Sequence, residues 1–221
     1  MTEDTQTQEV PAFVFQSVVT LCVDFKNPQS YLAKDLSHEL ENEFDLRIDW
    51  QPFLVPPVTQ PRPQVAGEDR GTQHRRMRAE YNERDLKRYA RVRGLTVENI
   101  YRNPDSTIAG VGLLWAKRFS EDIVRSYVDG VFDHYWSEVL DIGDPLAIGR
   151  LLDEIGAEGE RFVEYARSEG FIELRERQAA LRSAGLFNVP GYVVQGEIFY
   201  GRQHLPMIRW LLSGRTGNGP I

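Results

Sequence analysis

One stretch near the amino end constrains the fold most strongly: an apolar run from Val18 to Val23 that leads into Asn27-Pro28 and a new helical pattern. The run is too continuously apolar for a strand with one face in water, so it predicts a strand buried on both faces of a sheet. Proline suits the first turn of a helix because its missing N–H needs no partner there, and Asn27 is a favourable N-cap. The free amides at this helix start are predicted to form a site for an anion or a thiolate.

The residues after this turn predict a strand–helix–strand unit. Leucines at four-residue spacing predict a helix that ends near Asn42, and residues 46–53 alternate between apolar and polar as a second strand. Two strands joined by a helical crossover must pair in parallel. The sequence therefore predicts an α/β fold.

A long helical block follows. Prolines and glycines interrupt every pattern in residues 54–72, which predicts a long loop. From His74 to about Gly185 the periodicity is helical, with one helix stopped at Gly94 and Ser120 as the cap between two others.

Sheet signals return only near the carboxyl end. Residues 186–194 lead into a tight turn at Gln195-Gly196, residues 197–200 form the partner strand, and a helix is expected over residues 203–212. Pro190 breaks the rule that central strands lack proline, and a special bend with a cis peptide bond explains it best.

The two sheet halves must share one core across the helical block. We therefore expect a loose tail over residues 1–16, one sheet-containing domain made of residues 17–66 and 186–221, and a helical insertion domain over residues 67–185.

Composition excludes several classes of function. The net charge of -7 argues against nucleic acid as a partner, although Arg75, Arg76 and Arg78 are a local exception. No apolar run approaches the roughly 20 residues that span a bilayer, and acids stand at the amino end where a signal peptide has basic residues. We expect a cytoplasmic protein that does not associate with membranes.

The single cysteine, Cys22, excludes both an intrachain disulfide and a Cys-x-x-Cys redox pair. It lies inside the apolar strand and is interpreted as a buried, inert thiol. The four histidines show no metal-ligand spacing, so no metal site is expected.

Five segments together carry a resemblance to a known family. They are Asp24-Phe25-x-Asn27-Pro28-x-Ser30-Tyr31-Leu32, Tyr81–Leu86, the apolar helix around Trp115, Gly185–Gly191 and Tyr200–Met207. In their order and spacing they resemble the DsbA-like thioredoxin superfamily, and within it the branch of 2-hydroxychromene-2-carboxylate isomerases and kappa-class glutathione transferases. The resemblance implies a thioredoxin-like fold (βαβ…ββα) interrupted by an all-helical insertion domain, and family members often form homodimers.

The resemblance also implies a reaction. The family binds glutathione, and its isomerases add the thiol reversibly to a conjugated double bond. This chain would then be a glutathione-dependent isomerase or transferase that acts on a small aromatic or α,β-unsaturated carboxylate. Such chemistry needs a thiolate held at a helix N-terminus and a donor that stabilises it.

By resemblance, the catalytic position is Asn27, next to Pro28, where the family has a serine. The backbone of Val189, before the cis-proline Pro190, would pair with the cysteinyl part of glutathione as an added strand. Arg78 corresponds to a basic residue that meets a peptide carboxylate.

The γ-glutamyl end of glutathione would meet the segment Gly201-Arg202-Gln203-His204, which reads Gly-Ser-Asp-Arg in the family. Arg202 is a second residue that would hold a carboxylate. Gln203 replaces the acid that pairs with the ligand ammonium, a charge-assisted hydrogen bond of roughly 1.5–3 kcal/mol. His204 lies at the ligand-facing start of the last helix.

Alternative interpretations remain open at this stage. Asn27 also fits a purely structural role as an N-cap, and it cannot relay a proton as a hydroxyl can. A thioredoxin-fold binding protein that has lost catalysis is therefore the second hypothesis. A disulfide oxidoreductase is disfavoured, because no cysteine stands in residues 27–30.

Overall fold

The computed structural model describes residues 12–220. The expected tail therefore lies largely outside the described residues. The elements in chain order are β1 (Val19–Val23), α1 (Pro28–Phe44), β2 (Ile48–Pro52), α2 (Arg70–Val92), α3 (Thr107–Ala116), α4 (Glu121–Trp136), α5 (Pro145–Glu154), α6 (Gly159–Arg167), α7 (Glu169–Ser183), β3 (Gly191–Val194), β4 (Glu197–Tyr200), the 3-10 turn η1 (Arg202–His204) and α8 (Leu205–Leu212).

The four strands form one sheet in the order β2-β1-β3-β4. β1 and β2 run parallel, as the helical crossover requires, and β3 lies antiparallel to β1 on its other side. The β3–β4 hairpin closes through Gln195 and Gly196, whose φ angles of 52° and 80° are those of a tight two-residue turn. Every residue of β1 is buried, so the expected strand with two covered faces is confirmed.

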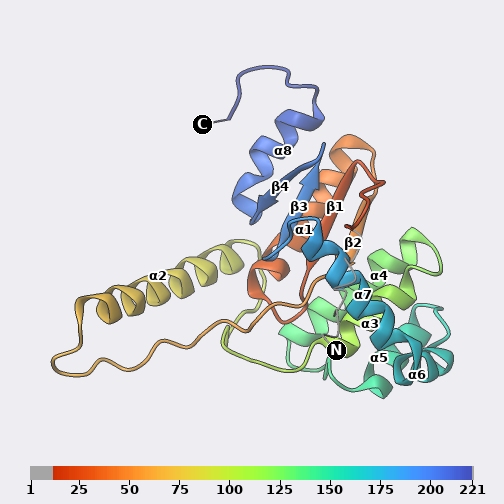
Figure 1. Ribbon diagram of the computed structural model, residues 1–221, viewed down its shortest axis with the longest axis horizontal. Coiled ribbons are helices and arrows are strands. Elements are labelled where there is room, and N and C mark those ends of the chain that lie inside the picture. Colours follow the sequence, from red (N-terminus) through yellow and green to blue (C-terminus); the bar gives the residue numbers. More distant parts are fainter. Residues whose placement is uncertain (1–11, 221) are drawn as a thin grey trace, which may run out of the picture.

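Helices cover both faces of the sheet (Figure 1). Leu21 of β1 and Tyr192 of β3 share a core cluster with Leu32 of α1, and α8 packs into the same cluster. On the other face, Cys22 packs with Leu181 of α7. The α/β architecture with inserted helices is thus confirmed.

The helical block is organised around α3, of which nearly every residue is buried. The Trp115 indole N–H donates to the Ala157 carbonyl oxygen (2.6 Å), and the Tyr127 hydroxyl donates to the Ala109 carbonyl oxygen (2.8 Å). The first bond joins α3 to the turn between α5 and α6, and the second joins α3 to α4. The block is therefore built around one apolar helix, and its buried residues belong to the same core cluster as those of β1 and α1.

Aromatic stacking and an ionic cluster join α1 to α4. The Tyr31 and Trp136 rings stack with centroids 5.5 Å apart. Farther along α1, His38 bonds Glu41 through one ring nitrogen and Asp129 of α4 through the other, both at 2.9 Å. The helix that begins at the Asn27 turn is thereby fixed against the helical block.

Helix α2 leaves the rest of the molecule, together with the loop before it (Figure 1). We call residues 56–92 the arm. Only Leu86 and Ala90 of α2 are buried, near its carboxyl end. The Tyr101 hydroxyl donates to Glu83 (3.0 Å), and Val58 packs against the core, so the arm is attached near its two ends.

Two boundaries differ from the sequence expectation. α2 begins at Arg70, four residues before His74, because the Asp69 carboxylate accepts the Thr72 amide hydrogen bond and caps the helix earlier. The strand expected over residues 186–194 is limited to β3, since the chain bends at the cis Val189–Pro190 bond.

A pair of glycines in α3 tests the packing of the helical block. Gly112→Ala is expected to destabilise the protein by about 1–3 kcal/mol, because the new Cβ would lie 2.1 Å from the Tyr127 hydroxyl oxygen and 2.9 Å from Ile148. Gly110→Ala is the matched control: its Cβ has only ordinary contacts of 3.4 Å or more, so better helix propensity should leave stability equal or higher. Chemical denaturation measures both, and equal effects would contradict the packing described.

The α1–α4 ionic cluster predicts a pH dependence of stability. Burial alone would lower the pKa of His38, but its bonds to Asp129 and Glu41 outweigh burial and raise the pKa above its ordinary value. His38 therefore stabilises the fold fully below about pH 6.5, and this contribution disappears as the pH rises through the folded-state pKa. The difference in unfolding free energy between the native chain and His38→Gln should shrink from about pH 6 to about pH 9.

The same substitution at His134, an exposed residue outside this cluster, is the control for the loss of an imidazole. A stability difference at His38 that does not change with pH would exclude this role of the cluster.

Candidate functional site

Two bends of the chain lie side by side where β1 ends and β3 begins. β1 ends at Val23 before the Asn27 turn, and the antiparallel β3 starts at Gly191, opposite Cys22. The cis Val189–Pro190 bond therefore lies beside the turn that starts α1. Sequence analysis predicted both bends, and the fold brings them together.

Asn27 caps α1 with its own side chain. Its Oδ1 accepts hydrogen bonds from the amides of Gln29 (2.9 Å) and Ser30 (3.2 Å). Because Pro28 has no N–H, the first two amides that an anion would use are already bonded. The expectation of free amides at this helix start is wrong, and the Asn27 side-chain N–H group is the remaining donor at the turn.

A buried carboxylate holds the turn in place. Asp24 is 1% exposed, and its carboxylate accepts the amides of Val55 (2.9 Å) and Lys26 (3.3 Å). Burial raises the pKa of Asp24, although the Val55 amide and the neighbouring Ser106 hydroxyl oppose the rise. The β1–α1 turn is thus fastened to the segment that follows β2 and lies beside the start of α3.

A cation stands directly before the cap. The Lys26 ammonium lies 4.0 Å from Asp24, and its side chain is only 13% exposed. A partly buried ammonium favours negative charge in its surroundings. This residue had no role in the sequence analysis.

In the loop before the cis-proline, one backbone amide is hydrogen-bonded by a side chain of the same loop. The Val189 amide donates to the Asn188 side-chain oxygen (2.9 Å), so this amide, predicted to pair with a ligand, already has a partner. The Pro190 carbonyl accepts the Gly201 amide (2.8 Å), which joins the bend to the end of β4. Phe187 packs on Tyr200 with ring centroids 4.3 Å apart and is 72% exposed.

Arg202 reaches the Asn27 turn from the far edge of the sheet. Its guanidinium donates to the Gln29 side-chain oxygen and lies 4.3 Å from the centre of the Tyr89 ring. Burial lowers the pKa of Arg202, but arginine stays charged at any pH of interest. The site therefore contains a permanent positive charge, and this charge contacts the side chain of Gln29, the residue after Pro28.

The neighbours of Arg202 are more exposed. The Gln203 side chain donates to the Tyr200 carbonyl oxygen (2.9 Å). His204 lies with its ring 5.9 Å from that of Phe199. Both residues are exposed.

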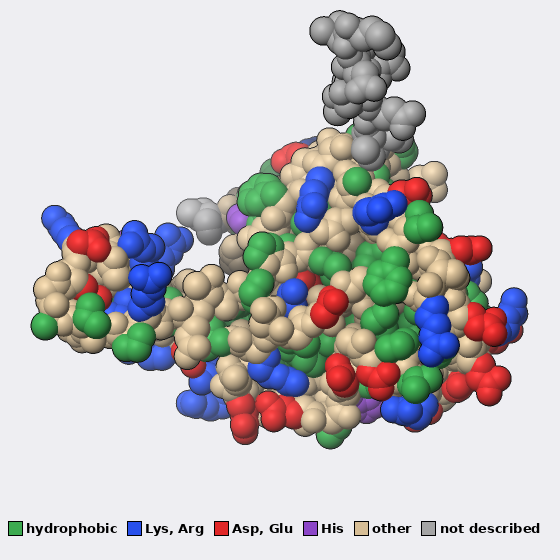
Figure 2. Space-filling model, turned by 60° about the horizontal axis from the view of Figure 1, so that its bottom comes forward, with side chains coloured by type: hydrophobic (Ala, Val, Ile, Leu, Met, Phe, Trp, Pro, Cys, Tyr) green, Lys and Arg blue, Asp and Glu red, His purple; other side chains and the backbone are tan. Residues whose placement is uncertain are grey.

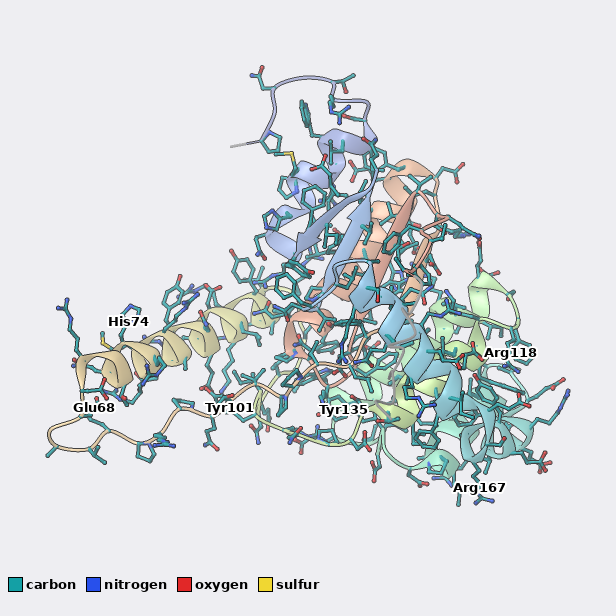
Figure 3. The ribbon with its side chains drawn as sticks, in the orientation of Figure 1. Glu68, His74, Tyr101, Arg118, Tyr135 and Arg167 are labelled. Atoms are coloured by element: carbon teal, nitrogen blue, oxygen red, sulfur yellow. The ribbon has the colours of Figure 1, made fainter. Side chains whose placement is uncertain are left out.

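Arg78 is not brought to this group of residues. It lies on the exposed part of the arm, eleven residues before Tyr89, which is about 16 Å along a helix. In Figure 3, His74, one turn before Arg78, stands near the tip of the arm. The role that the resemblance gives Arg78 stays a prediction.

An apolar groove of about 490 Å³ lies between α7, the start of α3 and Leu54. Phe171 and Ile172 of α7 contribute half-exposed apolar side chains to it, and Arg175 and Arg182 stand in its lining. Leu54 precedes Val55, the residue bonded to Asp24, so the groove begins beside the Asn27 turn.

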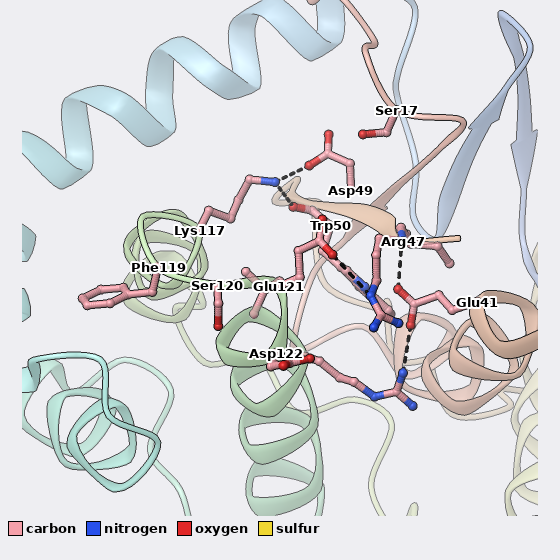
Figure 4. A pocket seen from close by; sticks show the side chains of 13 residues that line it. Ser17, Glu41, Arg47, Asp49, Trp50, Lys117, Phe119, Ser120, Glu121 and Asp122 are labelled. Carbon is pink, nitrogen blue, oxygen red and sulfur yellow. Dashed lines mark hydrogen bonds and ion pairs between the residues drawn. The ribbon is translucent and has the colours of Figure 1, made fainter. Parts of the chain in front are cut away.

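A smaller hollow of about 180 Å³ lies at the opposite edge of the sheet, next to Ser17 and Ile48 (Figure 4). Most of its charges are paired: Lys117 bonds Asp49, and Arg125 lies 3.2 Å from Glu41, while Asp122 has no ion-pair partner among the described residues. We assign this hollow no part in the site.

Besides Lys26, three residues of the site were not assigned from sequence: Gln29, Tyr89 and Asn188. Tyr89 has a helical spacing typical of a core residue, and only the path of α2 brings it against Arg202. Asn188 stands next to a predicted ligand-binding residue, and this adjacency is a signal that could have identified it.

The remaining properties of the described residues restrict the chemistry. Cys22 is fully buried, and burial raises the pKa of its thiol far above the ordinary value. In residues 12–220 no cluster of three or more His, Cys, Asp or Glu side chains is placed to hold a metal ion. Within the same range no helix combines the length and the apolar character of a membrane span.

Comparisons with known structures agree on the fold. The structure of a 2-hydroxychromene-2-carboxylate isomerase superposes with a TM-score of 0.69 at 19% identity, covering 89% of this chain and 94% of that one. A probable DsbA oxidoreductase from Streptomyces coelicolor gives 0.64 at 14% identity, with 92% of each chain covered. The cytosolic disulfide reductase DsbM from Pseudomonas aeruginosa, solved with GSH, gives 0.55 at 14% identity, covering 87% and 91%.

At these identities the likeness establishes the fold alone. No curated protein matches the sequence. The model of the DSBA-like thioredoxin domain, however, matches residues 18–213. The chain belongs to the DsbA-like thioredoxin domain family.

Proposed function

We propose that this chain binds glutathione at the carboxyl edge of its sheet and uses it to isomerise or conjugate a small aromatic or α,β-unsaturated carboxylate. One observation carries the proposal: the capped start of α1, the cis Val189–Pro190 bend and the Arg202 guanidinium lie together at that edge. The fold likeness to a 2-hydroxychromene-2-carboxylate isomerase, and to a reductase solved with GSH, supports it.

The turn offers two groups that favour a thiolate. The Asn27 side-chain N–H can donate to sulfur while its oxygen remains the cap of α1. Lys26 adds a partly buried positive charge next to it. Hydrogen bonding and a nearby cation both lower the pKa of a thiol and raise the fraction of its reactive form.

The cis-proline bend and Arg202 would hold the peptide part of glutathione. Val189 is available through its carbonyl, and its amide becomes available if Asn188 turns away. Arg202 lies in reach of a peptide carboxylate at the Asn27 turn. The residues thus fit the central part of glutathione and one of its carboxylates.

The groove along α7 suits the second substrate. Apolar walls from Phe171 and Ile172 would take an aromatic ring, and Arg175 or Arg182 would pair with its carboxylate. When bound, glutathione supplies a thiol that adds to a conjugated double bond and leaves again, with no net oxidation. The chain's part is to hold the charges and to align the two substrates.

A binding protein without catalysis is the second candidate. The occupied amides at the Asn27 turn and at Val189 favour it, as does the lack of a carboxylate in residues 201–204. A disulfide exchange reaction needs an accessible thiolate, whereas Cys22 is buried and its pKa is raised.

Substitutions at Asn27 separate catalysis from capping. Aspartate and serine both cap helices well, so Asn27→Asp and Asn27→Ser should leave the unfolding free energy nearly unchanged. Asn27→Asp places a negative charge next to the sulfur and should lower turnover of a chromene carboxylate at least about tenfold. Asn27→Ser keeps a donor and should retain or raise turnover, which ultraviolet absorbance follows. Equal turnover in all three proteins would remove Asn27 from the mechanism.

A substitution at Gln203 tests the γ-glutamyl position. Gln203→Asp adds a carboxylate for the ligand ammonium and should tighten glutathione binding about ten- to a hundredfold in calorimetry, for a charge-assisted bond of roughly 1.5–3 kcal/mol. Gln203→Asn is the neutral control. Cysteinylglycine, which lacks the γ-glutamyl group, should gain nothing from the aspartate. Absence of glutathione binding in every form would refute the proposed function.

A further inference from the structure

The arm has an excess of positively charged side chains, and most of them form no ion pair with a described residue, although the whole molecule is acidic. Residues 56–92 contain nine arginines and lysines against five acids, while the whole chain has a net charge of -7. Arg76, Lys87 and Arg88 form ion pairs within the arm. Six further arginines have no carboxylate partner among the described residues: Arg62, Arg70, Arg75, Arg78, Arg84 and Arg91.

The arm also lacks the packing that normally stabilises a helix. α2 has 23 residues and buries only Leu86 and Ala90. Met77 and Tyr81, four residues apart on one helical face, are 57% and 56% exposed. Isolated helices are marginal in water, because most helical stability in proteins comes from a packed apolar face. The exposed face of α2 is therefore short of a partner.

The opposite charge gathers on helices α4 to α6. Residues 121–167, from the start of α4 to the end of α6, contain twelve acids against four arginines. Seven of these acids form no ion pair with a described residue: Asp122, Asp141, Asp144, Asp153, Glu154, Glu160 and Glu164. Figure 2 shows basic side chains on the projecting lobe, and acidic side chains interspersed with basic ones along the lower and right margins of the main body.

The arm cannot use its own acidic surface, because α2 leaves the molecule on the side away from α5 and α6 (Figure 1). We propose that the arm of one copy packs across the α4–α6 surface of a second copy of this chain. In a two-fold dimer this contact occurs twice, since each arm meets the other copy's acids. The free arginines supply charge complementarity, and Met77 and Tyr81 supply the apolar contact.

Sedimentation velocity of the full chain tests the proposal. We expect a dimer at about 0.1 M salt that dissociates toward monomer at about 1 M salt, where the Debye length falls from roughly 10 Å to roughly 3 Å. The arm variant Arg75→Glu/Arg84→Glu and the body variant Glu154→Arg/Glu160→Arg should each raise the dimer dissociation constant at least about tenfold. All four positions are exposed, and circular dichroism verifies that each variant is folded.

Charge exchange makes the test specific. In an equimolar mixture of the two variants, each reversed arm faces a reversed body, and each native arm faces a native body. The mixture should therefore form a heterodimer, although either variant alone is monomeric. Arg215→Glu, which reverses an exposed charge outside both surfaces, should leave the dimer intact.

Three results would overturn the proposal. They are a native chain that stays monomeric at about 0.1 M salt, a dimer that neither variant weakens, and a mixture that stays monomeric. The measurement requires no glutathione, so it stands or fails independently of the proposed reaction.

Discussion

The buried Asp24 carboxylate is the interaction on which the candidate site depends. A carboxylate without access to water is stable only where hydrogen bonds satisfy it, and here they come from Lys26 in its own turn and from Val55 after β2. Those bonds place the end of β1 and the exit of β2 in one fixed arrangement beside the start of α3. The Asn27 cap, the Lys26 ammonium and the entrance of the α7 groove all derive their positions from it.

The backbone of the thioredoxin-like part could be predicted from residues with one strong preference. The apolar run before Asn27-Pro28 favours a buried strand, and Gly196 favours a tight turn because glycine readily takes a positive φ; the structure follows both preferences. The side-chain arrangement of the site could not be predicted in the same way. Whether an asparagine oxygen takes its helix's amides, or Asn188 takes the Val189 amide, depends on distances of a few ångströms that no residue pattern records.

In the helical block, too, the helices could be predicted from the sequence but their arrangement in space could not. Periodicity identified its helices, and α2 has far fewer apolar residues than α4, but this difference alone did not show that α2 projects from the molecule. The net charge of the chain likewise gave no indication of which helix projects. The value of -7 conceals a basic arm and an acidic α4–α6 surface, and only the path of the chain separates them in space. The arm and the candidate site are in contact, because Tyr89 of α2 lies against Arg202.

The cap of α1 has a thermodynamic consequence for any ligand. With its oxygen bonded to the amides of Gln29 and Ser30, Asn27 acts as a tethered competitor for the position that a thiolate would take. A ligand that used those amides would exchange hydrogen bonds with the protein instead of adding new ones, so the net gain would be small. Selectivity at this turn therefore favours ligands that bind the outer, N–H side of the asparagine, and the helix keeps its cap while such a ligand is bound.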